Sequence, residues 1–128
     1  MDLRDSIEAG LTGTPVNDWA LAALRGAAAT IQEVLGIADA RVRIVPGVMT
    51  AYGLQYRVRL EVPSLADYTD TLFRAYVNAD GVTLDTDGDL RSVCRDAAAL
   101  QADIADAFGA GSELSQRLSQ IRAMARAA

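Results

Sequence analysis

Residues 54–62 read LQYRVRLEV, and this stretch decides the fold. Its apolar side chains stand at every second position, and Gln55, Arg57, Arg59 and Glu61 stand between them. In a β-strand, side chains two residues apart lie on the same face of the sheet. The stretch therefore predicts a strand with one apolar face turned to a core and one charged face turned away from it.

Neighbouring segments predict further strands. Residues 41–45 alternate in the same way, and Pro46-Gly47 indicates a bend before the next strand. After a polar connection at 64–70, residues 72–78 set apolar positions against Arg74 and Tyr76. A turn at 78–81 leads to a short strand at 82–85. Because the connections are short, we expect an antiparallel meander of three or four strands.

Helices flank these strands on both sides. Apolar residues recur at helical spacing from 15 to 35, with Thr14 placed to cap the helix, Pro15 at its first position and Gly36 after its end. Residues 2–11 predict a short helix with Leu3, Ile7 and Leu11 on one side. A stripe from Leu90 to Phe108 predicts a third helix, capped by Asp87 or Asp89, and Ser112 caps a fourth.

The pattern as a whole predicts an α+β fold. It consists of an N-terminal helix, a three- to four-stranded antiparallel meander and two C-terminal helices. We expect residues 1–128 to form a single domain, with residues 1–13 a loosely attached N-terminal segment.

The basic residues point away from catalysis. All twelve are arginines, and the chain has no lysine and no histidine. It therefore lacks an imidazole base or metal ligand, a Schiff-base lysine and a phosphate-binding lysine. We expect a protein that is not an enzyme and needs no cofactor.

Two features could still carry chemistry. Asp80, Asp85, Asp87 and Asp89 form the densest carboxylate cluster, which would suit calcium or magnesium in an enzyme or a sensor, but the spacing fails the EF-hand pattern. Turn and helix-start roles explain these acids equally well. Cys94 has Arg91 and Arg95 nearby, which could activate its thiol, although a buried structural role is the simpler interpretation.

The arginines of the predicted sheet offer the best candidate site. By strand phase, one polar face carries Arg41, Arg43, Arg57, Arg59, Arg74 and Tyr76. Glu61 and Asp70 could neutralise these cations within the chain. The face could instead receive an acidic protein partner, or contact the phosphates of a nucleic acid or another anionic ligand.

A net charge of −5 disfavours nucleic acid and anionic membrane as partners. The first five residues show no apolar stretch of the secretory type, so we expect no leader, and we expect no membrane-spanning stretch. The single cysteine cannot form an internal disulfide. We therefore expect a cytoplasmic protein, and its arginine-rich composition is typical of bacteria or phages.

No motif identifies a family. In architecture and acidity the chain resembles small acidic α+β secretion chaperones, which dimerise and bind partner proteins. Small phage inhibitors and immunity proteins fit the same description. The function expected from the sequence is a protein-binding module (a chaperone, inhibitor, immunity or adaptor protein), and a homodimer is compatible with it.

Overall fold

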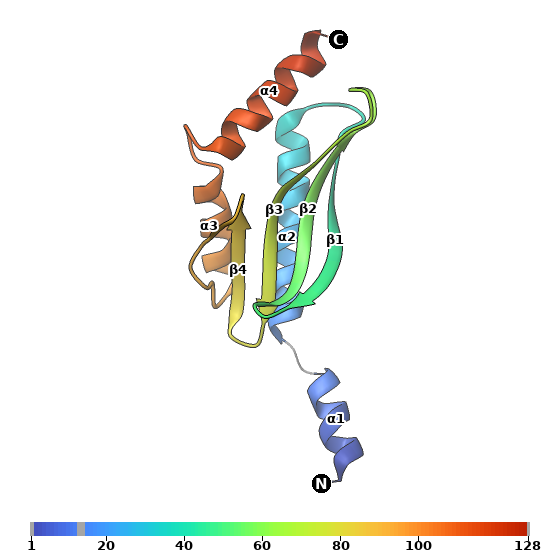
Figure 1. The fold of residues 1–128 in the computed structure, drawn as a ribbon, viewed down its shortest axis with the longest axis vertical. Coiled ribbons are helices and arrows are strands. Elements are labelled where there is room, and N and C mark those ends of the chain that lie inside the picture. The colour runs from blue at the N-terminus through green and yellow to red at the C-terminus, as the bar shows by residue number, and fades with distance from the viewer. Residues whose placement is uncertain (1, 13–14, 128) are drawn as a thin grey trace.

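A five-stranded antiparallel sheet forms the centre of the molecule, in the order β1-β2-β3-β4-β5 (Figure 1). The computed structural model describes residues 2–12 and 15–127. Its elements are α1 (Leu3–Thr12), α2 (Pro15–Leu35), β1 (Arg41–Thr50), β2 (Gly53–Val62), β3 (Tyr68–Asn78), β4 (Gly81–Thr86), β5 (Asp89–Leu90), α3 (Ala97–Ala107) and α4 (Glu113–Ala127). The predicted α+β architecture is confirmed, with five strands in place of three or four because the two-residue β5 adds to the meander.

The alternation in residues 54–62 produces the expected strand. Along β2, buried residues alternate with half-buried ones, and Tyr56, Val58, Leu60 and Val62 face the core. In β3, Phe73, Ala75 and Val77 lie opposite core-facing residues of β2. The sheet therefore has one face built for a core and one face built for polar side chains.

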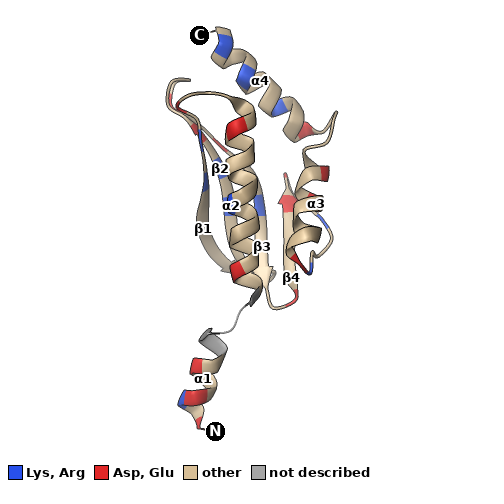
Figure 2. Cartoon of the chain, turned by 180° about the vertical axis from the view of Figure 1, so that it is seen from behind, with Lys and Arg blue, Asp and Glu red and all other residues tan. Residues whose placement is uncertain are grey.

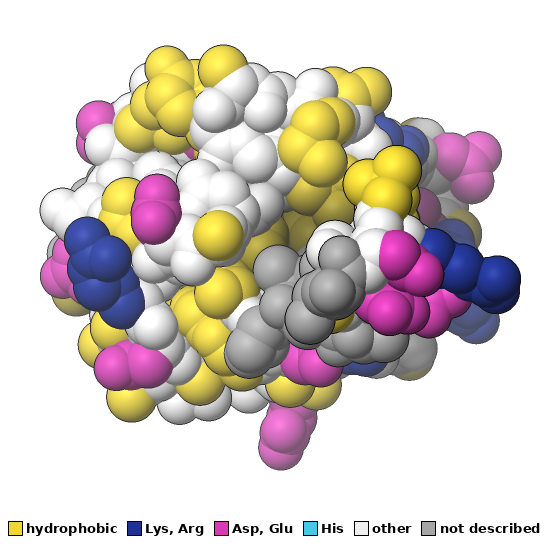
Figure 3. Space-filling model, turned by 90° about the horizontal axis from the view of Figure 1, so that it is seen from below, with side chains coloured by type: hydrophobic (Ala, Val, Ile, Leu, Met, Phe, Trp, Pro, Cys, Tyr) yellow, Lys and Arg dark blue, Asp and Glu magenta, His cyan; other side chains and the backbone are white. Residues whose placement is uncertain are grey.

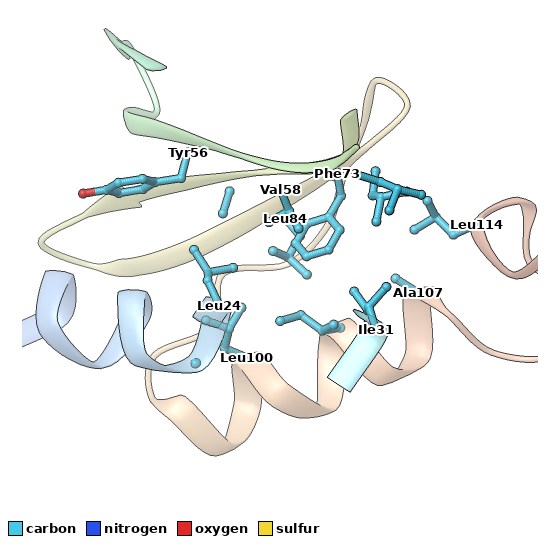
Figure 4. Close-up of a cluster of buried hydrophobic side chains, with 14 of the residues drawn as sticks. Leu24, Ile31, Tyr56, Val58, Phe73, Leu84, Leu100, Ala107 and Leu114 are labelled. Atoms are coloured by element: carbon cyan, nitrogen blue, oxygen red, sulfur yellow. The ribbon is translucent and has the colours of Figure 1, made fainter. Parts of the chain in front are cut away.

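Helices α2 and α3 cover the apolar face of the sheet (Figure 1). The core therefore lies in a single layer between these helices and the sheet. Leu24 and Ile31 of α2 and Leu100 of α3 point toward Val58 and Phe73 of the sheet (Figure 4). Pro15 begins α2 as predicted, and Gly36 follows its last residue with a φ of 63°. The expected cap at Thr14 lies outside the described residues.

The first strand is longer than predicted. β1 continues through Pro46 and Gly47 to Thr50, with an irregular register between Pro46 and Met49, so the predicted bend is wrong. Proline is tolerated because its nitrogen points away from β2, toward the edge of the sheet. Four residues earlier on the same edge, the Val42 N–H donates to Oε1 of Gln32 at 3.0 Å.

The third helix begins later than predicted. Its N-cap is Asp96, whose side chain accepts a hydrogen bond from the Ala99 N–H at 2.8 Å, and neither Asp87 nor Asp89 caps it. Residues 89–94 instead lie along β4, where Cys94 exchanges backbone hydrogen bonds of 2.7 and 2.9 Å with Val82. Pairing to a buried strand outweighs the helical spacing of a few apolar residues.

Two arginines attach the C-terminal helices to the sheet. Arg91 bonds Asp103 at 2.8 Å and also Asp106, both on α3. Arg117 of α4 bonds Asp70 of β3 at 3.1 Å and Asp87 at 2.8 Å. The Ser112 hydroxyl accepts a hydrogen bond from the Ser115 N–H, which confirms the predicted cap of α4.

Candidate functional site

The polar face of the sheet bears no helix in the described part of the chain, because α2 and α3 lie together on the other side (Figure 1). This open face is defined by Arg43 of β1, Gln55, Arg57, Arg59 and Glu61 of β2, Arg74 and Tyr76 of β3, and Asp85 of β4. The strand register places these residues on one side of the sheet. No described helix therefore covers this face, although Tyr76 and Asp85 within it are themselves nearly buried.

Strand register sets four of the arginines against one another. Arg43 lies directly opposite Arg59 across β1 and β2, and Arg57 lies directly opposite Arg74 across β2 and β3. Side chains at such opposed positions come within contact distance, so like charges there repel. Carboxylates are therefore needed to balance the positive charge of these arginines.

Only one of these two arginine pairs is balanced within the described residues. Glu61 accepts Arg43 at 3.5 Å and Arg59 at 3.7 Å. Over residues 2–12 and 15–127, Arg57 and Arg74 make no ion pair. The carboxylate considered from the sequence as a second neutralising group, Asp70, bonds Arg117 of α4 instead.

Arg57 also has an unsatisfied hydrogen-bond donor. Its Nε is buried and has no hydrogen-bond partner in the part of the chain that the structure describes. A buried donor without an acceptor is destabilising by roughly 1–3 kcal/mol. Such groups are rare in folded proteins and call for an explanation.

The carboxylate that faces Arg74 in the strand register is engaged by other polar groups. Asp85 lies opposite Arg74 in the register and is 9% exposed. Its Oδ2 accepts a hydrogen bond from the Tyr76 hydroxyl at 3.3 Å, and its Oδ1 accepts one from the Gly88 N–H at 2.7 Å. Asp85 therefore offsets part of the charge on this face without forming an ion pair with Arg74.

Tyrosines extend the open face toward the β1–β2 turn. The Tyr76 hydroxyl also accepts a hydrogen bond from Nε2 of Gln55 at 3.4 Å, and its ring centroid lies 5.6 Å from that of Tyr52. Tyr76 is only 8% exposed, whereas Tyr52 is 55% exposed. Tyr52 therefore supplies an accessible aromatic surface at one end of the arginines, which sequence reasoning missed because it lies in a turn.

The remaining predicted arginine, Arg41, lies at the margin of the open face. Arg41 is exposed at the first position of β1, on the edge of the sheet, and lies opposite Glu61 in the register. The structure therefore brings Arg43, Arg57, Arg59, Arg74 and Tyr76 together on one face and leaves Arg41 at its margin.

The aspartates considered as metal ligands are dispersed. Asp80 is exposed in the β3–β4 turn, and Asp89 is exposed at the first position of β5. Asp85 accepts a hydrogen bond from Tyr76, and Asp87 is paired with Arg117. Among the described residues no three carboxylates or thiols converge in a way that could hold a metal ion. Arg117 instead forms ion pairs with Asp70 and Asp87, which join α4 to the sheet.

Cys94 lies in a setting that suppresses its reactivity. Burial, followed by the neighbouring charge of Asp103, raises the pKa of the thiol from its ordinary 9.0 to about 11. The Arg91 guanidinium acts in the opposite direction but is itself bonded to Asp103. The thiol therefore stays protonated at neutral pH.

We expect folded protein at pH 8 to react with a thiol-specific disulfide reagent at least about 100 times more slowly than unfolded protein, because both burial and protonation oppose the reaction. Since the folded pKa is raised, this group's contribution to stability is complete below pH 9 and declines as the pH rises toward 11. Stopped-flow absorbance with and without guanidinium measures the rate. Equal rates would contradict the buried setting.

In the described ranges, none of the helices is long and apolar enough to cross a membrane. The chain matches no protein-family model, no curated protein and no solved structure.

Proposed function

We propose that this protein is a non-enzymatic protein-binding module whose open face receives an acidic segment of a partner protein. The observation that carries the proposal is the opposed pair of Arg57 and Arg74, which has no ion-pair partner in residues 2–12 and 15–127. The pair lies on a face that no described helix covers.

Guanidinium groups suit this task because each presents donors in a planar fork that matches a carboxylate. A carboxylate placed between Arg57 and Arg74 relieves the repulsion between them. Tyr52, whose ring packs against Tyr76, adds an accessible aromatic anchor beside the cations. Arginine and tyrosine are both enriched at protein interfaces. The partner expected is therefore a glutamate- or aspartate-rich segment with an apolar residue near it.

The test is binding of a fluorescent, glutamate-rich peptide of about 20 residues, measured by anisotropy at low and physiological salt. Reversal of both free arginines, Arg57→Glu with Arg74→Glu, is expected to weaken binding about 100-fold or more. Each charged hydrogen bond contributes about 1.5–3 kcal/mol, and 1.4 kcal/mol is a factor of ten.

A matched control changes the net charge by the same amount elsewhere. Arg25 of α2 and Arg95, which precedes α3, are both exposed, and reversing both is expected to change peptide affinity less than threefold. Equal losses in the two double variants would reduce the effect to net charge and contradict the site. A labelled oligonucleotide of similar length serves as comparator, and tighter binding of it would assign the face to nucleic acid.

A further inference from the structure

The N-terminal helix presents an apolar side that its own chain leaves uncovered. Leu3 is 77% exposed and Ile7, one helical turn later, is 52% exposed. α1 extends away from the rest of the molecule at the end where α2 begins (Figure 1). Seen from that end, hydrophobic side chains reach the surface in several places (Figure 3). A ten-residue helix is marginal in water unless it packs against another surface.

An apolar groove lies on the far side of the sheet from the arginines. It has a volume of about 580 Å³, and α2, α3 and α4 contribute Ala27, Ile31, Ile104, Phe108 and Leu118 to its lining. Of the described residues that line it, Arg122 is the only charged one. α2 and α3 lie side by side (Figure 2), and the residues that they contribute to the groove are all uncharged. The groove is therefore suited to an amphipathic helix, which would insert residues spaced one turn apart.

Gly26 in the middle of α2 also lines this groove. Glycine is less favourable than alanine inside a helix. A Cβ atom at Gly26 would meet nothing within 4 Å, and its backbone does not need positive φ. Packing within the single chain therefore gives no reason for a glycine, whereas close approach of another helix does.

Chain length argues against occupancy by the same molecule's α1. The groove follows α2 from Ala23 to Leu35, so its middle lies about 21 Å from Pro15 at 1.5 Å per residue. If α1 folded back along its own α2, the roughly 11 Å spanned by the three steps from Thr12 to Pro15 would be used to cross the roughly 8–10 Å between packed helix axes. Measured along α2, Ile7 would then lie about 8 Å and Leu3 about 14 Å from Pro15. The apolar side would stop short of the middle of the groove. The helix of a second copy has no such tether.

We propose that α1 of one copy docks in the α2–α3–α4 groove of a second copy, and that the exchange is reciprocal. The charges agree with this arrangement, because α1 and its cap carry Asp2, Asp5 and Glu8 against a single Arg4, and the groove carries Arg122. A two-fold axis lets both helices and both grooves be used, as in most homodimers. The dimer leaves the open face of each sheet exposed and does not depend on the proposed binding of an acidic partner.

Sedimentation velocity of the full chain from about 1 to about 200 µM tests the proposal. Wild type is expected to pass from monomer to dimer over this range. Ile7→Asp is expected to weaken dimerisation at least tenfold. Ala9→Asp introduces the same charge on the opposite, exposed side of α1 and is expected to leave it within twofold. Gly26→Leu adds a side chain on the groove, where its Cβ atom would meet nothing within 4 Å, and is expected to act like Ile7→Asp.

Disulfide trapping identifies the contact itself. Chains with Ile7→Cys are mixed with chains with Thr30→Cys, which lies on the groove, and a mixed disulfide is expected. Native Cys94 stays in place because it is only 5% exposed. Monomer at all concentrations, a dimer insensitive to Ile7→Asp, or faster closure within one chain carrying both cysteines would overturn the proposal. Reversal of Arg57 and Arg74 is expected to leave the dimer unchanged, which separates this result from the fate of the proposed function.

Discussion

Replacing Gly81 by alanine is expected to destabilise the protein by about 3 kcal/mol or more, through a steric clash and backbone strain together. Gly81 begins β4 with a φ of 143°, a conformation that favours glycine. A Cβ atom there would lie 2.2 Å from the carbonyl oxygen of Cys94. The oxygen cannot move aside because Cys94 is held to Val82 by two backbone hydrogen bonds. Urea unfolding followed by circular dichroism measures the loss.

Two glycine controls separate the steric clash from the backbone strain. Gly88→Ala introduces strain without a clash, since its φ is 87° and nothing lies within 4 Å of the added carbon, so a loss of about 1–2 kcal/mol is expected. Gly26→Ala introduces neither, and in dilute monomer it is expected to stabilise by about 0.5–1 kcal/mol. Equal losses for Gly81→Ala and Gly88→Ala would mean that residues 89–94 do not press against β4.

Truncating Phe73 to alanine is expected to lower the free energy of unfolding by about 3–5 kcal/mol. Phe73 is 2% exposed and is among the largest fully buried side chains of the core. Its ring meets that of Phe108 edge to face, with centroids 5.9 Å apart, and so joins the sheet to the end of α3. The change removes this contact and leaves a cavity between sheet and helices (Figure 4). Chemical denaturation measures the change.

Tyr52→Ala is the matched aromatic control. The Tyr52 ring also packs against an aromatic neighbour but is 55% exposed, so a loss of about 1 kcal/mol or less is expected. A loss for Phe73→Ala no larger than that for Tyr52→Ala would show that the layer between sheet and helices is not a packed core.

Much of the fold is predictable because burial of one face of a strand or helix requires apolar residues at regular intervals in the sequence. Val58 and Leu60 must alternate with arginines if β2 has a covered side and an open side. Gly36 and Pro15 mark the ends of α2 for local conformational reasons. The failures have nonlocal causes. The spacing of Leu90 and Cys94 looks helical, but hydrogen bonds to β4 decide their conformation.

The candidate site is predictable in part for the same reason. Strand phase correctly groups Arg57, Arg59 and Arg74, because phase depends only on neighbours in sequence. Their partners depend on the whole fold, and Asp70 is engaged by Arg117, 47 residues later. The near-complete burial of Tyr76 depends in the same way on residues distant in sequence, and no periodicity reports it.

The outer edge of β1 bears on how the molecule behaves at high concentration. An unpaired strand edge can template the addition of further strands, which is the first step of fibril growth. Here Gln32 accepts the N–H of Val42 and Pro46 has no N–H, so two of the three outward-pointing positions from 42 to 46, one on each side of Ile44, cannot donate to an incoming chain. These two positions interrupt the row of donors along the β1 edge, and we expect this to disfavour the edge-to-edge addition of strands.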